Sequence, residues 1–189
     1  MNRTGRNRWI NFFWYQALWL TAVAGGTPVT LALLFLLALH LLWVECWRSE
    51  LMLMVGCAVP GCVADGLLVS LGVFVFVPTP SPGPIPLWLI AIWLGFAGTL
   101  RGSLRWLSTR PPLMAILAGV GAPLAYLSAA RLGAVTFPLG ALLTGGIIGA
   151  VWVALSPWLC WLTRQSYGWQ SGRLAAGSLY LKQEIDDVK

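Results

Sequence analysis

The sequence predicts an all-α, polytopic membrane protein: a bundle of six transmembrane helices with both termini on the cytoplasmic side. Of its 189 residues, 58% are hydrophobic and only 10% are charged, whereas soluble domains carry roughly 25% charged residues. Six apolar stretches are each long enough to cross a bilayer. The basic residues gather at alternate ends of these stretches, which indicates a single orientation in the membrane.

Each predicted span has about 17 to 25 predominantly apolar residues. Together the spans form one domain over residues 1–165, with approximate limits 9–25, 28–45, 51–71, 85–107, 113–130 and 139–162. The first stretch also resembles a signal peptide, but Asn11, Gln16 and three Trp residues within it favour a retained helix. Residues 166–189 are too few for a core of their own and are predicted to form a cytoplasmic tail.

The distribution of Lys and Arg sets the orientation. With a cytoplasmic N-terminus, all twelve of these residues except Arg131 fall at or near cytoplasmic ends of the spans. The connections after the first and third spans, "GGTP" and "VPTPSPGPIP", contain no charge. The sequence therefore predicts a multi-pass protein of the cytoplasmic membrane, with membrane lipid as its surroundings.

Several kinds of chemistry are not indicated by the sequence. The net charge of +6 is spread between apolar runs and forms no basic recognition face, so no nucleic-acid partner is expected. The single histidine, His40, and the cysteines give no ligand set for a metal, and no cofactor is expected. The chain also lacks a nucleophile elbow, a phosphate-binding glycine loop and an H-E-x-x-H motif, which makes an enzyme the less favoured class.

One carboxylate, Asp65, lies in the apolar stretch "GCVADGLLVSLG". A charge at the centre of a bilayer costs at least ~2.5 kcal/mol and normally faces a partner or a wet cavity. We expect Asp65 to face the bundle interior in its outer half, paired with Arg131 at the outer end of the fifth span. This pair is either a structural ion pair or part of a ligand site, and the ligand-binding candidates are Asp65, Arg131, Tyr126 and His40.

A second polar group is predicted on the inner side. Glu45 closes the second span, and Arg101 and Arg105 lie one turn apart on the fourth, where they share a face. Glu45 is expected near Arg101 or Arg105, and the alternative is that these side chains snorkel separately to the interface. His40, deeper in the second span, either bonds a neighbouring helix or takes part in a site.

Five stretches, "NFFWYQALWL", "LALHLLW", "DGLLVSLG", "LRGSLRWL" and "GAPLAYLSAARLGAV", resemble a family of small bacterial inner-membrane proteins that is described as a domain of unknown function. The resemblance extends from about Asn11 to Arg164 and implies no catalytic residue. It implies a lipid connection, because family members are encoded near cyclopropane-fatty-acid synthases and other lipid-modification genes. The Asp65 stretch is also similar to a helix of rod-shape membrane proteins and of six-helix vitamin-uptake substrate-binding subunits.

Three functions follow as hypotheses. The first is an accessory or lipid-binding component of fatty-acyl modification, with a membrane lipid and a lipid-modifying protein as partners. The second is the substrate-binding subunit of a small-molecule transporter, with Asp65, Arg131 and Tyr126 in its pocket. The third is an intramembrane enzyme that uses His40 and either Asp65 or Glu45 as acid and base.

Overall fold

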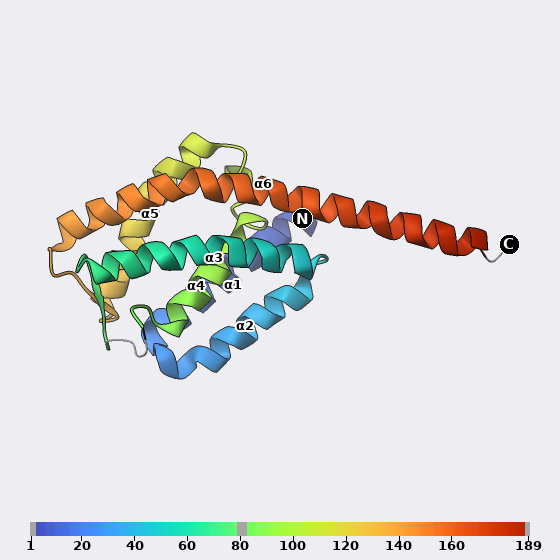
Figure 1. The fold of residues 1–189 in the computed structure, drawn as a ribbon. Helices are drawn as coiled ribbons and strands as arrows, with labels where there is room; N and C mark the ends of the chain where they lie inside the picture. Colours follow the sequence, from blue (N-terminus) through green and yellow to red (C-terminus); the bar gives the residue numbers. More distant parts are fainter. Residues whose placement is uncertain (1–2, 79–82, 188–189) are drawn as a thin grey trace.

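The computed structural model describes the backbone of residues 3–78 and 83–187, and the side chains of residues 8–78 and 83–169. This part of the chain consists of helices, two very short strands and the connections between them (Figure 1). In chain order the elements are α1 (Arg3–Gly25), η1 (Thr27–Val29), α2 (Thr30–Trp43), α3 (Trp47–Ser70), β1 (Val75–Phe76), α4 (Leu87–Leu100), η2 (Arg105–Leu107), α5 (Pro111–Arg131), β2 (Val135–Thr136) and α6 (Ala141–Asp187).

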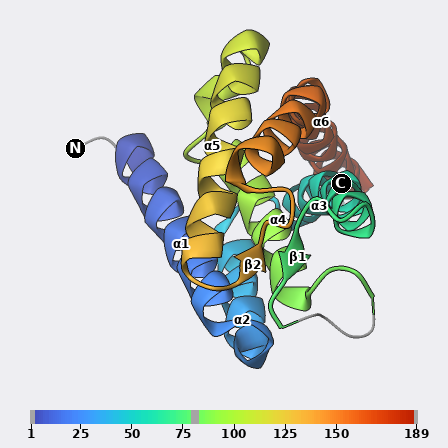
Figure 2. The same cartoon turned by 90° about the vertical axis from the view of Figure 1, so that its left-hand side faces the viewer.

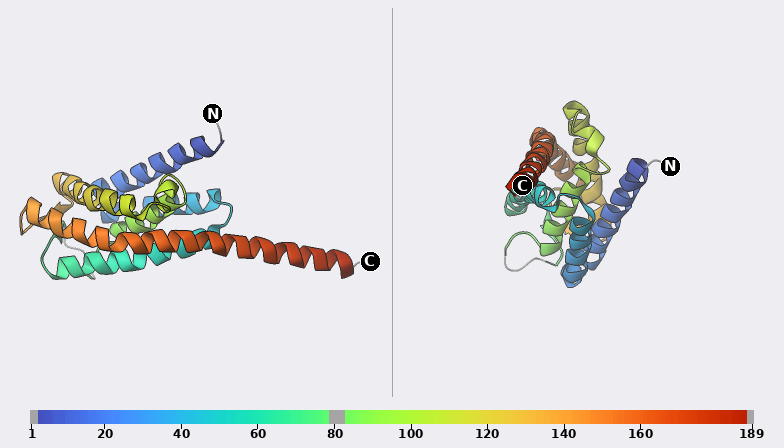
Figure 3. Two further views of the ribbon diagram at one scale, coloured as in Figure 1. Left: turned by 90° about the horizontal axis from the view of Figure 1, so that it is seen from above. Right: turned by 90° about the vertical axis from the view of Figure 1, so that its right-hand side faces the viewer.

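Helix α4 lies at the centre of the bundle and contacts α1, α2 and α3. Nine of its 14 residues are buried, because the neighbouring helices cover most of its surface. Helices α3 and α6 run side by side, and α6 extends well beyond the rest of the bundle (Figures 1 and 3). Helix α5 packs on α6, so it stands on the far side of the bundle from α2.

A two-stranded antiparallel sheet closes one end of the bundle (Figure 2). In it Val75 pairs with Thr136 and Phe76 with Val135, and the buried side chains of Phe76 and Val135 point into the core. The sheet ties the α3–α4 connection to the α5–α6 connection. Both connections therefore lie at the same end, as an antiparallel arrangement of α3 with α4 and of α5 with α6 requires.

Three helices are long and apolar enough to span a membrane: Trp47–Ser70, Pro111–Arg131 and Ala141–Trp169. Two further apolar helices, Thr27–Trp43 and Leu87–Leu100, are shorter. Large apolar side chains lie exposed on the outside of the bundle, such as Leu31, Leu42 and Leu142, each at least 80% exposed. A continuous apolar exterior of this kind is expected of a surface that faces lipid. The all-α membrane class is thus supported, whereas six full-length spans are not.

The fourth predicted span, 85–107, is wrong at its C-terminal end, because α4 ends at Leu100. The side chain of Asn11 in α1 explains why α4 ends at Leu100. Its amide nitrogen donates to Gly98 O at 3.1 Å, and its oxygen accepts hydrogen bonds from both the backbone N–H and the hydroxyl of Ser103. The Asn11 side chain therefore takes up backbone groups that a continued helix would pair internally.

The backbone also shows no break between the last predicted span and the predicted tail. We expected the span to end near 162, but α6 continues as one helix from Ala141 to Asp187, with Pro157 inside it. Its C-terminal part has no neighbouring helix (Figure 3).

Candidate functional site

Asp65 faces the interior of the bundle, as the sequence predicts, and is only 2% exposed. Its two carboxylate oxygens accept one hydrogen bond each: Oδ1 from the hydroxyl of Tyr126 at 2.6 Å, and Oδ2 from the indole Nε1 of Trp93 at 2.7 Å. The three residues come from α3, α5 and α4. The carboxylate therefore links three helices that are distant in the sequence.

The predicted pairing of Asp65 with Arg131 is wrong. Arg131 is the last residue of α5 and is exposed, and the ion pairs within the described part of the chain all involve Glu50. The exposed position lets the guanidinium group stay hydrated at the end of the helix. Two neutral donors satisfy Asp65 instead, which avoids the desolvation of a cation.

Trp93 is the partner that the sequence analysis missed. Its ring packs against Gly61, four residues before Asp65 on the same face of α3, where an added Cβ would overlap the ring. The ring also stacks on Trp152 of α6, with centroids 4.7 Å apart and planes 10° from parallel. Gly61 and Trp152 thus hold the indole so that its N–H reaches the carboxylate.

An apolar pocket of about 320 Å³ lies next to this network, between α5 and the pair α1–α4. On one side its walls are aromatic, with Tyr15, Trp19, Trp93 and Phe96 among them. On the other side, α5 presents the small residues Ala118, Gly121, Ala122, Ala125 and Ala129. The pocket exists because small side chains on α5 do not fill the space in front of the aromatic wall.

The polar atoms of Trp93 and Tyr126 turn away from this pocket. Trp93 and Tyr126 both line it, but their N–H and O–H groups are bonded to Asp65, which is not part of the lining. Leu117 and Gly121 line the pocket and are exposed on the outside of α5. Its interior therefore offers ring faces and alkyl groups, which suit an apolar chain.

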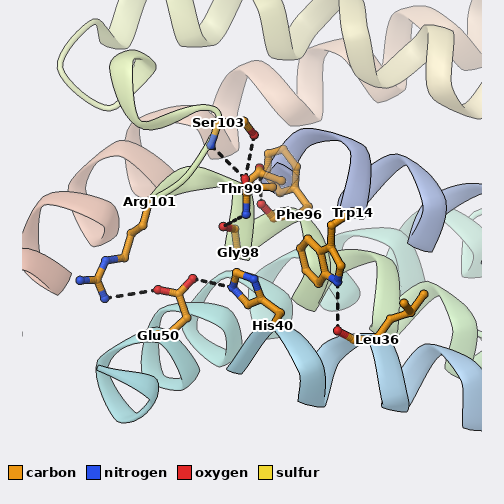
Figure 4. Close-up of polar contacts among 10 residues, drawn as sticks. Trp14, Leu36, His40, Glu50, Phe96, Gly98, Thr99, Arg101 and Ser103 are labelled. Atoms are coloured by element: carbon orange, nitrogen blue, oxygen red, sulfur yellow. Dashed lines mark hydrogen bonds and ion pairs between the residues drawn. The ribbon is translucent and has the colours of Figure 1, made fainter. Parts of the chain in front are cut away.

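A separate polar cavity of about 480 Å³ lies between α1, α2, α3 and the end of α4. At its centre Glu50 of α3, 2% exposed, bonds two neighbours (Figure 4). One oxygen lies 3.0 Å from His40 Nε2, and the other lies 3.3 Å from the guanidinium group of Arg101. The ring of Trp14 stacks on His40 at 4.4 Å and donates its N–H to Leu36 O.

Glu50, not Glu45, is the acidic partner of the predicted inner cluster. The sequence predicts a third span that starts at 51, which leaves Glu50 in a connection, but α3 begins at Trp47. Glu50 therefore lies in the first turn of the helix and faces inward. Glu45 lines the same cavity but is exposed. The order of residues alone did not distinguish these two acids, because both lie close to a helix end.

Arg101 and Arg105 do not share a face of one helix, as the sequence analysis expects, because Arg101 caps α4 and Arg105 begins η2, but both side chains contact one ring. Their guanidinium groups lie 5.2 and 5.0 Å from the centre of the Tyr167 ring on α6, in the range of cation–π contacts. Both side chains line the polar cavity. The ring thus holds two like charges side by side at the end of α4.

Among the described residues no group of three His, Cys, Asp or Glu side chains lies close enough to hold a metal ion.

A family of known sequences matches most of the chain. The family described as Protein of unknown function (DUF2878) matches residues 8–158, which include both cavities apart from Tyr167 beside the second. This match confirms the resemblance to a family without a known activity. No curated protein and no solved structure matches the chain.

Proposed function

This chain belongs to the DUF2878 family, and we propose that it is a multi-pass membrane protein that binds the acyl chain of a membrane lipid, as an accessory component of lipid modification. The observation that carries the proposal is the apolar pocket between α5 and the α1–α4 pair. Two of its lining residues, Leu117 and Gly121, are exposed on the outside of α5. An acyl chain in the surrounding bilayer would reach the pocket without crossing water.

The lining supports an alkyl ligand more than a polar one. Ring faces of Trp19, Trp88 and Phe96 oppose the alanine side chains of α5, and such a lining contacts a chain by dispersion and by exclusion of water. The nearest buried charge, Asp65, is already bonded by Trp93 and Tyr126. A polar substrate would therefore find few partners there.

The binding is tested by photocrosslinking with a phospholipid that carries a diazirine near the end of one acyl chain. We expect crosslinks to the pocket face of α5 and to the aromatic residues of α1 and α4. Ala122→Trp fills the pocket and should abolish these crosslinks, whereas the matched variant Val120→Trp, on the exposed face of the same helix, should keep them. Crosslinks confined to exposed residues in the unchanged protein would refute the proposal.

The same proposal includes an orientation with both termini in the cytoplasm. Support comes from the two ends of the bundle: the sheet end carries Arg131, while the opposite end carries Arg48, Arg101, Arg105 and Arg110. In this orientation all six helices belong to the membrane domain, with the shorter α2 and α4 covered by their neighbours. The membrane is the bacterial inner membrane, as the resemblance implies.

Cysteine labelling tests the orientation. Leu139 lies in the connection between β2 and α6, and Thr109 lies in the connection before α5; both are exposed. Leu139→Cys should react with a membrane-impermeant maleimide in intact cells, and Thr109→Cys only after permeabilisation, each measured against the protein without the added cysteine. The opposite pattern would reverse the topology.

Neither alternative function is proposed. The transport hypothesis needed Asp65 and Arg131 in one pocket, but Asp65 bonds Trp93 and Tyr126 and Arg131 is exposed. The enzyme hypothesis needed His40 beside Asp65 or Glu45, whereas His40 bonds Glu50.

A further inference from the structure

The polar cavity between α1, α2, α3 and α4 is distinct from the apolar pocket. The two spaces lie on different sides of α1: Asn11 and Trp14 line the polar cavity, and Tyr15 lines the apolar pocket. Between them, the side chain of Asn11 is bonded to Gly98 and Ser103 of the α4 end. A ligand of the polar cavity would therefore be recognised by a separate set of residues.

The charges that line the polar cavity balance one another. The lining contains two carboxylates and two guanidinium groups, those of Glu45, Glu50, Arg101 and Arg105. Glu50 is bonded on both oxygens, by His40 and by Arg101, and is buried (Figure 4). This inner pair forms the floor of the cavity and fixes the end of α4 against α3.

The other two charges come from different segments of the chain. Glu45 comes from the connection between α2 and α3, and Arg105 comes from η2 after α4. Both are exposed at the cavity, and no ion pair within the described residues joins them. Each therefore has a charge available to a ligand, since the contact of Arg105 with the Tyr167 ring leaves its N–H groups able to donate, and the two charges have opposite signs.

The position of the cavity at the helix ends indicates the source of a ligand that carries both charges. It lies where α2 ends at Trp43, α3 begins at Trp47 and α4 ends at Leu100. Apolar helices end at the headgroup level of a bilayer, where Trp and Arg side chains also concentrate. Trp43, 67% exposed, adds a ring face beside Glu45 in the cavity lining. A headgroup in this layer would lie in a cavity lined by both charges.

We propose that this cavity binds a zwitterionic phosphoethanolamine group, with the phosphate at Arg105 and the primary ammonium at Glu45. A guanidinium group donates parallel hydrogen bonds to phosphate oxygens. A primary ammonium has three N–H donors for a carboxylate, which a quaternary ammonium lacks. A balanced lining favours a ligand without net charge over an anionic one. The proposal does not rest on the acyl-chain pocket.

The test is native mass spectrometry of the purified full chain with phosphatidylethanolamine, phosphatidylglycerol and phosphatidylcholine that carry identical acyl chains. The unchanged protein should retain phosphatidylethanolamine about tenfold better than the other two, as one charge-assisted contact of about 1.4 kcal/mol allows. Glu45→Gln should remove this preference but leave binding of the phosphate, so that the three lipids are retained alike. Arg105→Gln should weaken retention of all three.

Arg48→Gln is the matched control, because Arg48 is exposed and stacks on Trp47 but does not line the cavity. It should leave retention unchanged. Equal retention of the three lipids by the unchanged protein would overturn the proposal, as would an Arg105→Gln variant that behaves like Arg48→Gln. Ala122→Trp should keep the headgroup preference, so that failure of the acyl-chain proposal is distinguished from failure of this one.

Soluble glycerophosphoethanolamine identifies the source of the group. If it displaces the lipid at millimolar concentration, the cavity accepts the free zwitterion; if only the intact lipid binds, the source is the membrane. Either result supports a phosphoethanolamine site, provided that glycerophosphocholine does not compete equally. Equal competition by glycerophosphocholine would overturn the role given to Glu45.

Discussion

Trp93 donates its indole N–H to Asp65 at 2.7 Å while its ring separates that carboxylate from the apolar pocket. The Trp93 side chain therefore has two roles in an apolar surrounding. It supplies a hydrogen bond to a buried acid, whose unsatisfied oxygen would cost several kcal/mol in hydrocarbon. It also presents only its ring to the ligand space, so the charge and the apolar pocket coexist within one bundle.

The hydrogen bonds to Asp65 predict a graded loss of stability. Asn keeps an oxygen for Trp93, which can only donate, and its amide can donate to the Tyr126 hydroxyl, which can also accept, but both bonds then lack the charge of the carboxylate. Asp65→Asn should lower the free energy of unfolding by about 1 kcal/mol, and Asp65→Leu by about 3 kcal/mol, because both donors then lack an acceptor. Unfolding in mixed detergent micelles measures both. A Leu variant as stable as the unchanged protein would contradict the network.

Arg131 should contribute little to the fold. Its side chain is exposed at the end of α5, and exposed substitutions usually change stability by less than about 0.5 kcal/mol. Arg131→Ala is therefore expected to unfold within that margin of the unchanged protein in the same assay. A loss comparable to that of Asp65→Leu would instead revive an ion pair between these two residues.

Glu50 and Glu45 should differ strongly although both line the polar cavity. Removing one partner of a buried ion pair costs about 3 to 5 kcal/mol, so Glu50→Gln, which leaves Arg101 without its carboxylate, should unfold at markedly lower denaturant concentration. Glu45→Gln changes an exposed side chain and should be nearly neutral. Similar losses for the two variants would mean that Glu45 also has a buried role.

The apolar pattern predicted the helical membrane class and the approximate place of each helix, because lipid exposure demands long apolar runs. It also singled out Asp65, since an isolated carboxylate in such a run needs a partner. It did not predict that partner. A sequence shows that Arg131 breaks the charge pattern, but it does not show which aromatic N–H a neighbouring helix turns inward.

One signal for Trp93 was present in the sequence. Gly61 and Asp65 are four residues apart and share a face of α3, so a flat ring that packs on the glycine lies next to the carboxylate. The polar cavity was harder to predict. Its acid, Glu50, depends on α3 starting at Trp47, and a helix start cannot be placed within one turn from an apolar pattern alone.

Gly61 supplies the last prediction. A Cβ at this position would overlap the fused ring of Trp93, and the ring cannot move aside because it stacks on Trp152 at 4.7 Å. Gly61→Ala should therefore displace the indole from Asp65 and destabilise the protein by about 1 to 3 kcal/mol, as overpacking does.

Gly146→Ala is the matched control: Gly146 lies in α6 with nothing within 4 Å of an added Cβ. There alanine should be neutral or stabilising by up to about 1 kcal/mol, since glycine is unfavourable inside a helix. Comparing the two variants by thermal unfolding and by near-ultraviolet circular dichroism, which reports the Trp environment, separates the steric effect from the helix propensity of alanine. If Gly61→Ala shifts neither signal more than Gly146→Ala does, the close contact between α3 and Trp93 does not position the indole.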